Sequence, residues 1–347
     1  NKYMNEIKEP YNKEESKFKK KSPEMIDCKE EYERYRMISK IGEGSTSEVF
    51  KVFDEQLGYE VCKKVIKECQ EETTMKTFRN ALKEIDFLNR VKHPCICESF
   101  CFNLQEKLQP TKNDEEYETE YDEDGNLDKE EKTTISLFIE YLPYSINDIR
   151  EKGILNNTLK VLISIEVAFG MSHIHSEGMI HRDLKIEHVM LNNVFNAKII
   201  DFGLVHMKES EQSMNTLSRG IGTLGYMSPE MLSEEEYDNK TDVYSYGIFL
   251  YVLFIGRLPK QSIRARLDKV PIDFPKKTKN LSEYCINLIK RCTSFESTKR
   301  PTFDEIIEDI ASHSFSLAPG IDKNIILSRY RFLNCIRSQQ KQQNKSD

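Results

Sequence analysis

The chain has 347 residues, 38% hydrophobic and 31% charged, so it can form two packed lobes with a well-solvated surface. No stretch reaches the roughly 18 apolar residues of a spanning helix, so we expect no membrane span. The net charge of −7 comes from residues 103–134, which contain twelve Asp and Glu and four Lys. The rest of the chain is nearly neutral, which argues against nucleic-acid binding because such binding needs a concentrated basic face.

The nine cysteines are scattered through the chain rather than arranged in a regular framework. This usage is typical of reduced thiols inside the cell, so we expect a cytoplasmic protein. The chain begins with Asn1 and shows no apolar core of a signal peptide at that end. We therefore expect a fragment or a trimmed chain.

The first part of the chain predicts a tail followed by strands and one helix. Residues 1–30 mix Lys and Glu with few apolar residues, which predicts a solvated tail. Apolar alternation over 32–66, interrupted by "GEGS" and Gly58, predicts three strands. Residues 73–91 change to apolar spacings of three and four behind a Thr N-cap, which predicts a helix.

The acidic insert 103–134 separates a strand predicted over 95–102 from another predicted over 135–142. Its composition predicts a mobile loop. Residues 120–131 within it follow a calcium-loop template at several positions, although Glu120 stands where Asp is preferred. A solvated acidic loop is the favoured interpretation.

The second part of the chain has mainly helical spacing. A long amphipathic helix is expected from Thr158 to near Gly178, followed by short strands carrying "HRDLK" and "KIIDFG". Residues 243–255 are apolar on all sides, which predicts a buried core helix. Amphipathic helices follow to about Ile310. Strands first and helices afterwards predict a two-lobed α+β fold.

A glycine-rich turn, "IGEGSTSEV" at 41–49, is the first motif with chemical meaning. Gly42 and Gly44 allow main-chain amides to approach phosphate oxygens, although glycines in a hairpin turn alone have a purely structural interpretation. In "EVCKKVI", Lys64 lies two residues after Cys62 and therefore on the same strand face. Lys63 points to the other face, and a slip of one residue would exchange the two lysines.

Six further segments follow in order. Glu84 lies within "ALKEIDFL", where it can pair with Lys64. The others are "HRDLKIEH" (181–188), "DFG" (201–203), "GTLGYMSPE" (222–230), "DVYSYG" (242–247) and "RP" (300–301). Together these motifs resemble the eukaryotic protein kinase family over about residues 33–310.

The resemblance implies an α+β, two-lobed protein kinase fold with an antiparallel N-lobe sheet plus one helix and a mainly helical C-lobe. It places the kinase domain at 31–313, divided into an N-lobe (31–141) and a C-lobe (142–313), with a C-terminal extension at 314–347. It implies an ATP-dependent signalling transferase acting on protein substrates. Lys185 and Thr223 match the serine/threonine branch, and the C-lobe is similar to the tyrosine-kinase-like group.

The resemblance also implies roles for individual residues. Asp183 would accept the proton of the substrate hydroxyl, Lys185 would steady the transferred phosphoryl group, and Lys64 with Glu84 would position the phosphates. Asp201 would hold Mg²⁺ (or Mn²⁺). Glu230 with Arg300, and His181 with Phe202, match structural pairs. The implied ATP-binding residues are Ile41, Gly42, Glu43, Gly44, Ser45, Val49, Cys62, Lys64, Glu140, Leu142 and Met190.

Two positions depart from the family pattern. Ser47 stands where the third glycine of the loop usually lies, a small change that the loop should tolerate. His188 occupies the position of the Asn that binds a second Mg²⁺, and Mg²⁺ prefers oxygen ligands. Either one metal at Asp201 suffices and His188 bonds locally, or the chain is a pseudokinase scaffold that binds nucleotide or a partner without efficient transfer.

Two elements predict regulation. In the activation segment 204–221, a phosphate on Thr216 or Ser218 could pair with Arg182, although these hydroxyls are also ordinary loop residues. Residues 321–337 predict a basic amphipathic helix. We favour its docking on the large lobe over the alternative, a site for a regulatory partner.

Overall fold

The structure is a computed structural model. It describes residues 24–44, 47–66, 71–105, 134–207, 223–276 and 281–343. The chain forms two compact units, each described by itself. The sheet unit takes in Lys19–Asn89 and Glu98–Tyr141, and the helical unit takes in Arg90–Cys97 and Leu142–Asp347.

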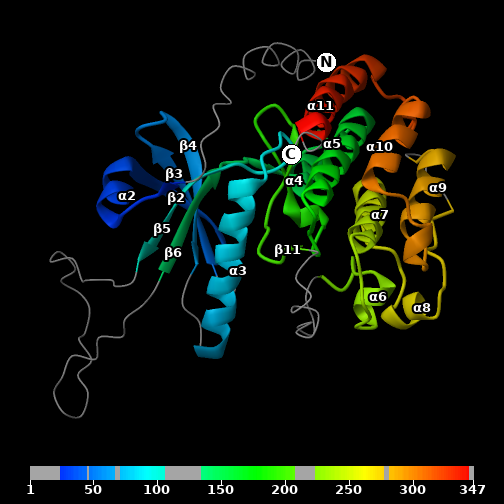
Figure 1. The fold of residues 1–347 in the computed structure, drawn as a ribbon. Helices are drawn as coiled ribbons and strands as arrows, with labels where there is room; N and C mark the ends of the chain where they lie inside the picture. Colours follow the sequence, from blue (N-terminus) through cyan, green and yellow to red (C-terminus); the bar gives the residue numbers. More distant parts are fainter. Residues whose placement is uncertain are drawn as a thin grey trace. The chain divides into compact units, whose positions relative to one another are not determined.

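The sheet unit is built on one sheet with the strand order β1-β5-β6-β4-β3-β2 (Figure 1). The predicted strands of 32–66 are β2–β4, and all neighbours pair antiparallel except the short β1, which runs parallel to β5. The bounds are β1 Glu24–Met25, β2 Tyr35–Glu43, β3 Ser47–Asp54, β4 Tyr59–Ile66, β5 Ser99–Gln105 and β6 Thr134–Glu140. The predicted helix is α3, Glu71–Arg90.

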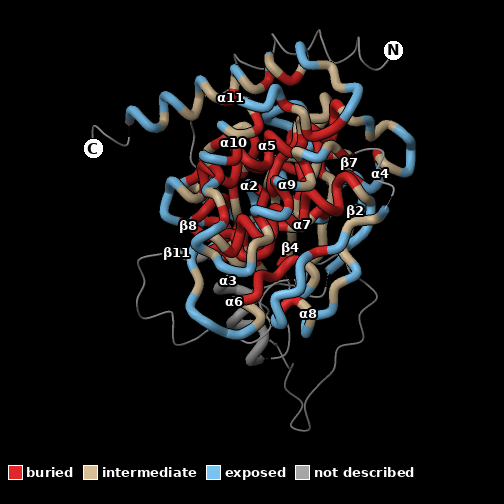
Figure 2. The backbone as a smooth tube through the Cα atoms, turned by 90° about the vertical axis from the view of Figure 1, so that its right-hand side faces the viewer, coloured by how far each residue is buried: buried red, intermediate tan, exposed pale blue. Residues whose placement is uncertain are grey.

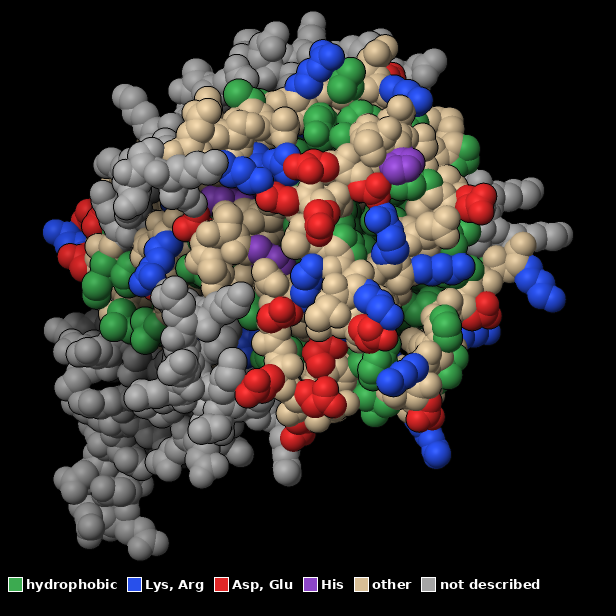
Figure 3. Space-filling view, turned by 45° about the vertical axis from the view of Figure 1, so that its right-hand side comes forward, with side chains coloured by type: hydrophobic (Ala, Val, Ile, Leu, Met, Phe, Trp, Pro, Cys, Tyr) green, Lys and Arg blue, Asp and Glu red, His purple; other side chains and the backbone are tan. Residues whose placement is uncertain are grey.

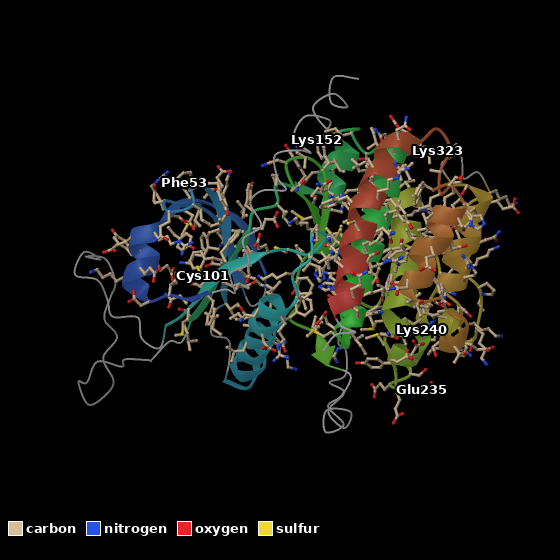
Figure 4. All side chains as sticks on the ribbon, turned by 45° about the horizontal axis from the view of Figure 1, so that its top comes forward. Phe53, Cys101, Lys152, Glu235, Lys240 and Lys323 are labelled. Carbon is tan, nitrogen blue, oxygen red and sulfur yellow. The ribbon has the colours of Figure 1, made fainter. Side chains whose placement is uncertain are left out.

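The expectation of a solvated tail over 1–30 is wrong for its described end. Residues from Glu24 form β1 and then a second helix of this unit, α2 (Cys28–Arg34), which is N-capped by Asp27 accepting from the Glu30 amide at 2.8 Å. This segment contains few apolar residues, but one of them, Ile26, lies in the core of the sheet unit and holds the segment there. Ile26 packs with Tyr35, Val52, Val61, Cys101 and Phe138. Figure 4 labels Cys101 on β5.

The two strands around the insert differ from their predicted bounds. β5 begins at Ser99 rather than at residue 95, because the chain before it makes other main-chain bonds within the helical unit. There Ile199 N donates to Cys95 O and Cys97 N donates to Ile199 O, both at 2.9 Å. Strand pairing also continues to Gln105 and resumes at Thr134. Residues 106–133, with the calcium-loop template, lie outside the described residues.

The helical unit is organised around two buried helices. Thr241–Phe254 of α7 are buried, as the sequence predicts. Every residue of α5 from Thr158 to Ile174 except Leu162 is also buried, so α5 is a core helix rather than an amphipathic one (Figure 2). In the described ranges, no helix combines the length and apolarity that crossing a bilayer requires. The helices are α4 Ile146–Glu151, α5 Asn157–Ser176, α6 Pro229–Leu232, α7 Lys240–Ile255, α8 Ile263–Leu267, α9 Glu283–Cys292, α10 Phe303–Ser312 and α11 Lys323–Gln343.

Short strands and turns carry the loops between these helices. "HRDLK" lies in the loop after β8 rather than in a strand, and "KIIDFG" begins in β10 and leaves it before Asp201. The bounds are β7 Tyr144–Ser145, β8 Met179–Ile180, η2 Ile186–His188, β9 Val189–Leu191, β10 Ala197–Ile199, β11 His206–Met207 and η4 Ser297–Lys299. β9 pairs with both β7 and β10, and β8 pairs with β11.

The C-terminal helix α11 docks on α5, and the two lie side by side in Figure 1. Ile326 and Leu333 are fully buried, so the face that a partner could have used is covered. Arg329 donates from Nε to Glu166 Oε1 at 2.6 Å, and both side chains are almost completely buried. Burial raises the pKa of Glu166 above its ordinary value, although Arg329 opposes the shift. Arg329 is therefore needed to compensate a desolvated carboxylate.

Replacing Arg329 should destabilise the helical unit strongly. We expect Arg329→Met to lower the free energy of unfolding by about 3–5 kcal/mol, because it leaves Glu166 buried without its cation. The exposed Arg331 on the same helix gives the control, and Arg331→Met should stay within about 0.5 kcal/mol of the parent. Equal urea-unfolding midpoints for the two variants would contradict the docking described here.

Candidate active site

The loop that follows β8 is held by one buried carboxylate, that of Asp242 on α7. Asp242 accepts from His181 N and Arg182 N, both at 2.8 Å, and His175 Nε2 lies 2.9 Å away. Burial alone would raise the pKa of Asp242, but the hydrogen bonds from His175 and from His181 N bring it below its ordinary value. These bonds also hold Arg182 at φ 69°, a left-handed conformation that costs energy for a non-glycine residue.

Asp183, Lys185 and Thr223 form a closed triangle of hydrogen bonds. Lys185 Nζ donates to Asp183 Oδ2 at 2.9 Å and to Thr223 Oγ1 at 2.8 Å. Thr223 donates to Asp183 Oδ1 from its main-chain N at 2.9 Å and from Oγ1 at 3.1 Å. The carboxylate is therefore fixed on one oxygen by Thr223, while Oδ2 retains acceptor capacity beside a cation.

His188 lies between the two aspartates of this site. Its Nδ1 is 2.9 Å from the main-chain O of Asp183, and its Nε2 is 3.2 Å from Asp201 Oδ2. A carbonyl can only accept, so Nδ1 carries the proton. Burial lowers the pKa of His188 below its ordinary value, although the Asp201 carboxylate opposes the shift. In the neutral ring the Nε2 lone pair faces an oxygen of the Asp201 carboxylate, so these two acceptors need a proton or a cation between them.

The His188–Asp201 pair has the geometry of two neighbouring metal ligands. On a six-coordinate cation with bonds of about 2.1 Å, adjacent donor atoms lie about 3 Å apart. A metal-binding His also usually donates its other N–H to a carbonyl or a carboxylate, as His188 Nδ1 does here. His188 and Asp201 are thus the two described residues that would hold a divalent cation here, one through nitrogen and one through a carboxylate oxygen.

The loop carrying Thr223 is held by Arg266 of α8, a residue that the sequence analysis missed. Arg266 is buried and donates from Nη1 to Met227 O at 2.6 Å and to Leu224 O at 3.0 Å, and from Nη2 to Gly225 O at 3.2 Å. Its position 43 residues after Thr223 belongs to no motif, so no local pattern could have identified it. Through this loop it positions the triangle around Asp183.

Removing this clamp should loosen the loop. Arg266→Met leaves three carbonyls without their donor, and we expect it to cost about 2–3 kcal/mol of stability and to accelerate hydrogen exchange over 223–228. Arg264 on the same short helix has a fully exposed side chain beside Asp268 and serves as the control. If Arg264→Met and Arg266→Met show the same exchange in this loop, the clamp is not what orders it.

Within the sheet unit, the two adjacent lysines of β4 have separate partners. Lys64 Nζ lies 2.7 Å from Glu84 Oε2 of α3, and Lys63 Nζ pairs with Glu31 of α2. The lysines therefore point to opposite faces of the sheet, as their period of two requires. Cys62 is buried beside Lys64, and burial raises the pKa of its thiol to about 12, so it remains neutral.

The glycine-rich turn connects β2 to β3. Gly42 pairs with Val49, and Gly44 N donates to Ser47 O at 2.8 Å. A Cβ at Gly42 would meet Val49 at 3.6 Å and one at Gly44 would meet Ser47 at 3.7 Å, both ordinary contacts. Among the described residues of this turn, neither packing nor a positive φ requires glycine at these two positions.

The other predicted residues fall in both units. Ile41 and Glu43 lie at the end of β2, Val49 on β3 and Glu140 at the end of β6, where its N donates to Glu98 O at 2.8 Å. In the helical unit, Leu142 is buried before β7 and Met190 lies on β9. Ser45, Thr216 and Ser218 lie outside the described residues.

Two pairs recognised in the sequence are structural. Arg300 donates to both oxygens of Glu230, at 2.5 and 2.8 Å, and is itself almost fully buried. His181 and Phe202 pack edge to face with ring centroids 5.4 Å apart. Arg182, the predicted partner of a phosphate, donates to Leu204 O and to the Tyr237 hydroxyl. These acceptors are neutral, and no carboxylate in the described part of the chain forms an ion pair with the Arg182 guanidinium.

The chain belongs to the protein kinase family, because the family model of the protein kinase domain matches residues 35–315. The match covers both units and every motif discussed above, and the α+β fold with an antiparallel sheet and a helical unit agrees with it. It ends before α11, so that helix is an addition to the matched domain.

Curated relatives are protein kinases of several organisms. A probable serine/threonine-protein kinase of Dictyostelium discoideum is 28% identical over 79% of this chain and 19% of its own length. Another from that organism is 31% identical over 81% of this chain and 28% of its own length. The serine/threonine/tyrosine-protein kinase HT1 of Arabidopsis thaliana is 28% identical over 82% of this chain and 67% of its own. The chain thus spans less than a third of the two Dictyostelium relatives.

Proposed function

We propose that this chain is an ATP-dependent serine/threonine protein kinase that transfers the γ-phosphate to hydroxyl groups of protein substrates. The observation that carries the proposal is the triangle of Asp183, Lys185 and Thr223, which places a carboxylate oxygen, an ammonium group and a hydroxyl within 3.1 Å of one another. The names of the relatives support the serine/threonine class.

In the proposed reaction, the substrate hydroxyl oxygen attacks the γ-phosphorus, the bond to the ADP oxygen breaks, and the hydroxyl proton passes to Asp183 Oδ2. Thr223 keeps the carboxylate turned toward the substrate, and Lys185 stabilises the negative charge on the transferred group. By the family pattern, Lys64, which Glu84 orients, has the role of contacting the phosphates of ATP. This division of roles follows the family pattern.

Asp201 Oδ2 and His188 Nε2 are the groups that would hold a divalent cation in this chain. Such a cation neutralises charge on the phosphates of the nucleotide. Because one of the two donors is nitrogen, we propose that the chain uses Mn²⁺ more readily than Mg²⁺, which strongly prefers oxygen.

The catalytic roles are tested by two substitutions in the purified chain. Asp183→Asn should abolish transfer to serine peptides while nucleotide affinity changes little, because the base does not bind the nucleotide. Lys64→Met should lower transfer at least as strongly by disturbing the phosphates, whereas Lys63→Met, on the opposite face, should leave it nearly intact. Radiolabelled phosphotransfer measures activity, and a fluorescent nucleotide measures binding. Full activity of Lys64→Met would overturn the assignment of this lysine.

The metal preference is tested at His188. His188→Asn supplies an amide oxygen in place of nitrogen and should raise the Mg²⁺-supported rate about tenfold, or ~1.4 kcal/mol, while reducing the advantage of Mn²⁺. Electron paramagnetic resonance of Mn²⁺ with nucleotide should show weaker binding to the variant. An unchanged ratio of the two rates would mean that His188 does not bind the metal. If neither the parent nor the variant transfers phosphate with either metal, the result would favour a scaffold that binds nucleotide without transfer.

A further inference from the structure

A groove of about 450 Å³ lies beside the catalytic loop within the helical unit. Lys185 and Thr223, both bonded to Asp183, form part of its wall. Ile186, Val252 and Leu258 give it apolar surface. Because it opens next to Asp183, a peptide presenting its hydroxyl to that carboxylate would place neighbouring side chains in this groove.

Arg150, in the last turn of α4, lines the groove as a partly buried cation. Its Nη1 donates to Asn147 Oδ1 at 2.7 Å and its Nη2 to Val252 O at 3.2 Å. Both acceptors are neutral, and no carboxylate of the described residues forms an ion pair with it. Burial lowers the pKa of Arg150 below its ordinary value. Arg keeps its charge nevertheless.

The surroundings of Arg150 add a second cation. Arg257, two residues after the last residue of α7, also lines the groove and has no ion pair among the described residues, while Glu187 is the acidic residue of the lining. On the face drawn in Figure 3, basic and acidic side chains are interspersed. The lining of the groove likewise combines basic residues with Glu187, so selection would depend on individual cations rather than on a broad basic surface.

We infer that Arg150, assisted by Arg257, selects protein substrates that carry an anionic side chain close to the phosphorylated residue. The inference rests on the proposed kinase function and deepens it. A guanidinium has five N–H donors, of which Arg150 uses two, so a carboxylate or phosphate can still be bound through paired hydrogen bonds. Pairing with such an anion supplies the compensation that the partly buried charge lacks.

The test uses matched serine peptides in which one flanking position at a time carries Asp, phosphoserine or the neutral Asn. At one or more positions the parent should prefer the anionic peptide by about tenfold in kcat/KM, chiefly through the KM for the peptide. Arg150→Met should remove this preference and leave the KM for ATP unchanged. Arg150→Lys should retain part of it. Comparing Asp with phosphoserine shows whether a carboxylate suffices or a phosphate is required.

Lys152 is the matched control, because it is a cation that directly follows the same helix (Figure 4). Its ammonium group lies over the Tyr144 ring, and Lys152 does not line the groove. Lys152→Met should keep the preference. Fluorescence anisotropy of the labelled peptides measures the same selectivity without turnover, so a failure of phosphotransfer and a failure of this inference are distinguishable. Equal binding of anionic and neutral peptides to the parent, or a preference that survives in a folded Arg150→Met, would overturn it.

Discussion

The carboxylate of Asp242 holds the start of the loop after β8 from the core of the helical unit. It is fully buried, yet it accepts two successive main-chain N–H groups, those of His181 and Arg182, and it contacts His175. An unsatisfied carboxylate at this depth would be very costly, so the loop and α7 are coupled: neither can move away without leaving the charge unpaired. Arg182 keeps its strained φ because the hydrogen bonds to Asp242 outweigh the energetic cost of this conformation.

A second chain of contacts reaches Asp201 from outside the matched kinase domain. Arg329 of α11 compensates Glu166 of α5, and Glu166 in turn accepts from Ala197 N of β10 at 2.7 Å. β10 continues directly toward Asp201, so the segment that carries Asp201 is anchored through a helix that lies outside the matched domain. The C-terminal extension is therefore part of the support of the site rather than an independent appendage.

The sequence predicted what short-range patterns encode. The strands β2–β4, the helix α3 and the buried α7 follow from periodicity, and the opposite directions of Lys63 and Lys64 follow from strand geometry. The sequence did not predict features whose structure depends on a few contacts between residues far apart in the chain. Ile26 joins the sheet core through one buried side chain within a charged stretch, and Arg266 reaches carbonyls about 40 residues away. The tautomer of His188 depends on the Asp183 carbonyl, which no sequence pattern specifies.

Main-chain carbonyls orient several polar side chains of the helical unit. The number of hydrogen bonds that each side chain gives to carbonyls distinguishes a side chain that only supports the structure from one that can still bind a ligand. Arg266 is buried and donates from its two Nη atoms to three carbonyls, so it braces the loop. His188 gives one N–H to a carbonyl and keeps its Nε2 lone pair toward Asp201. Arg150 likewise gives one bond to a carbonyl and keeps donors and charge at the groove. A neutral acceptor orients such a group without neutralising it, which preserves its capacity to bind a ligand.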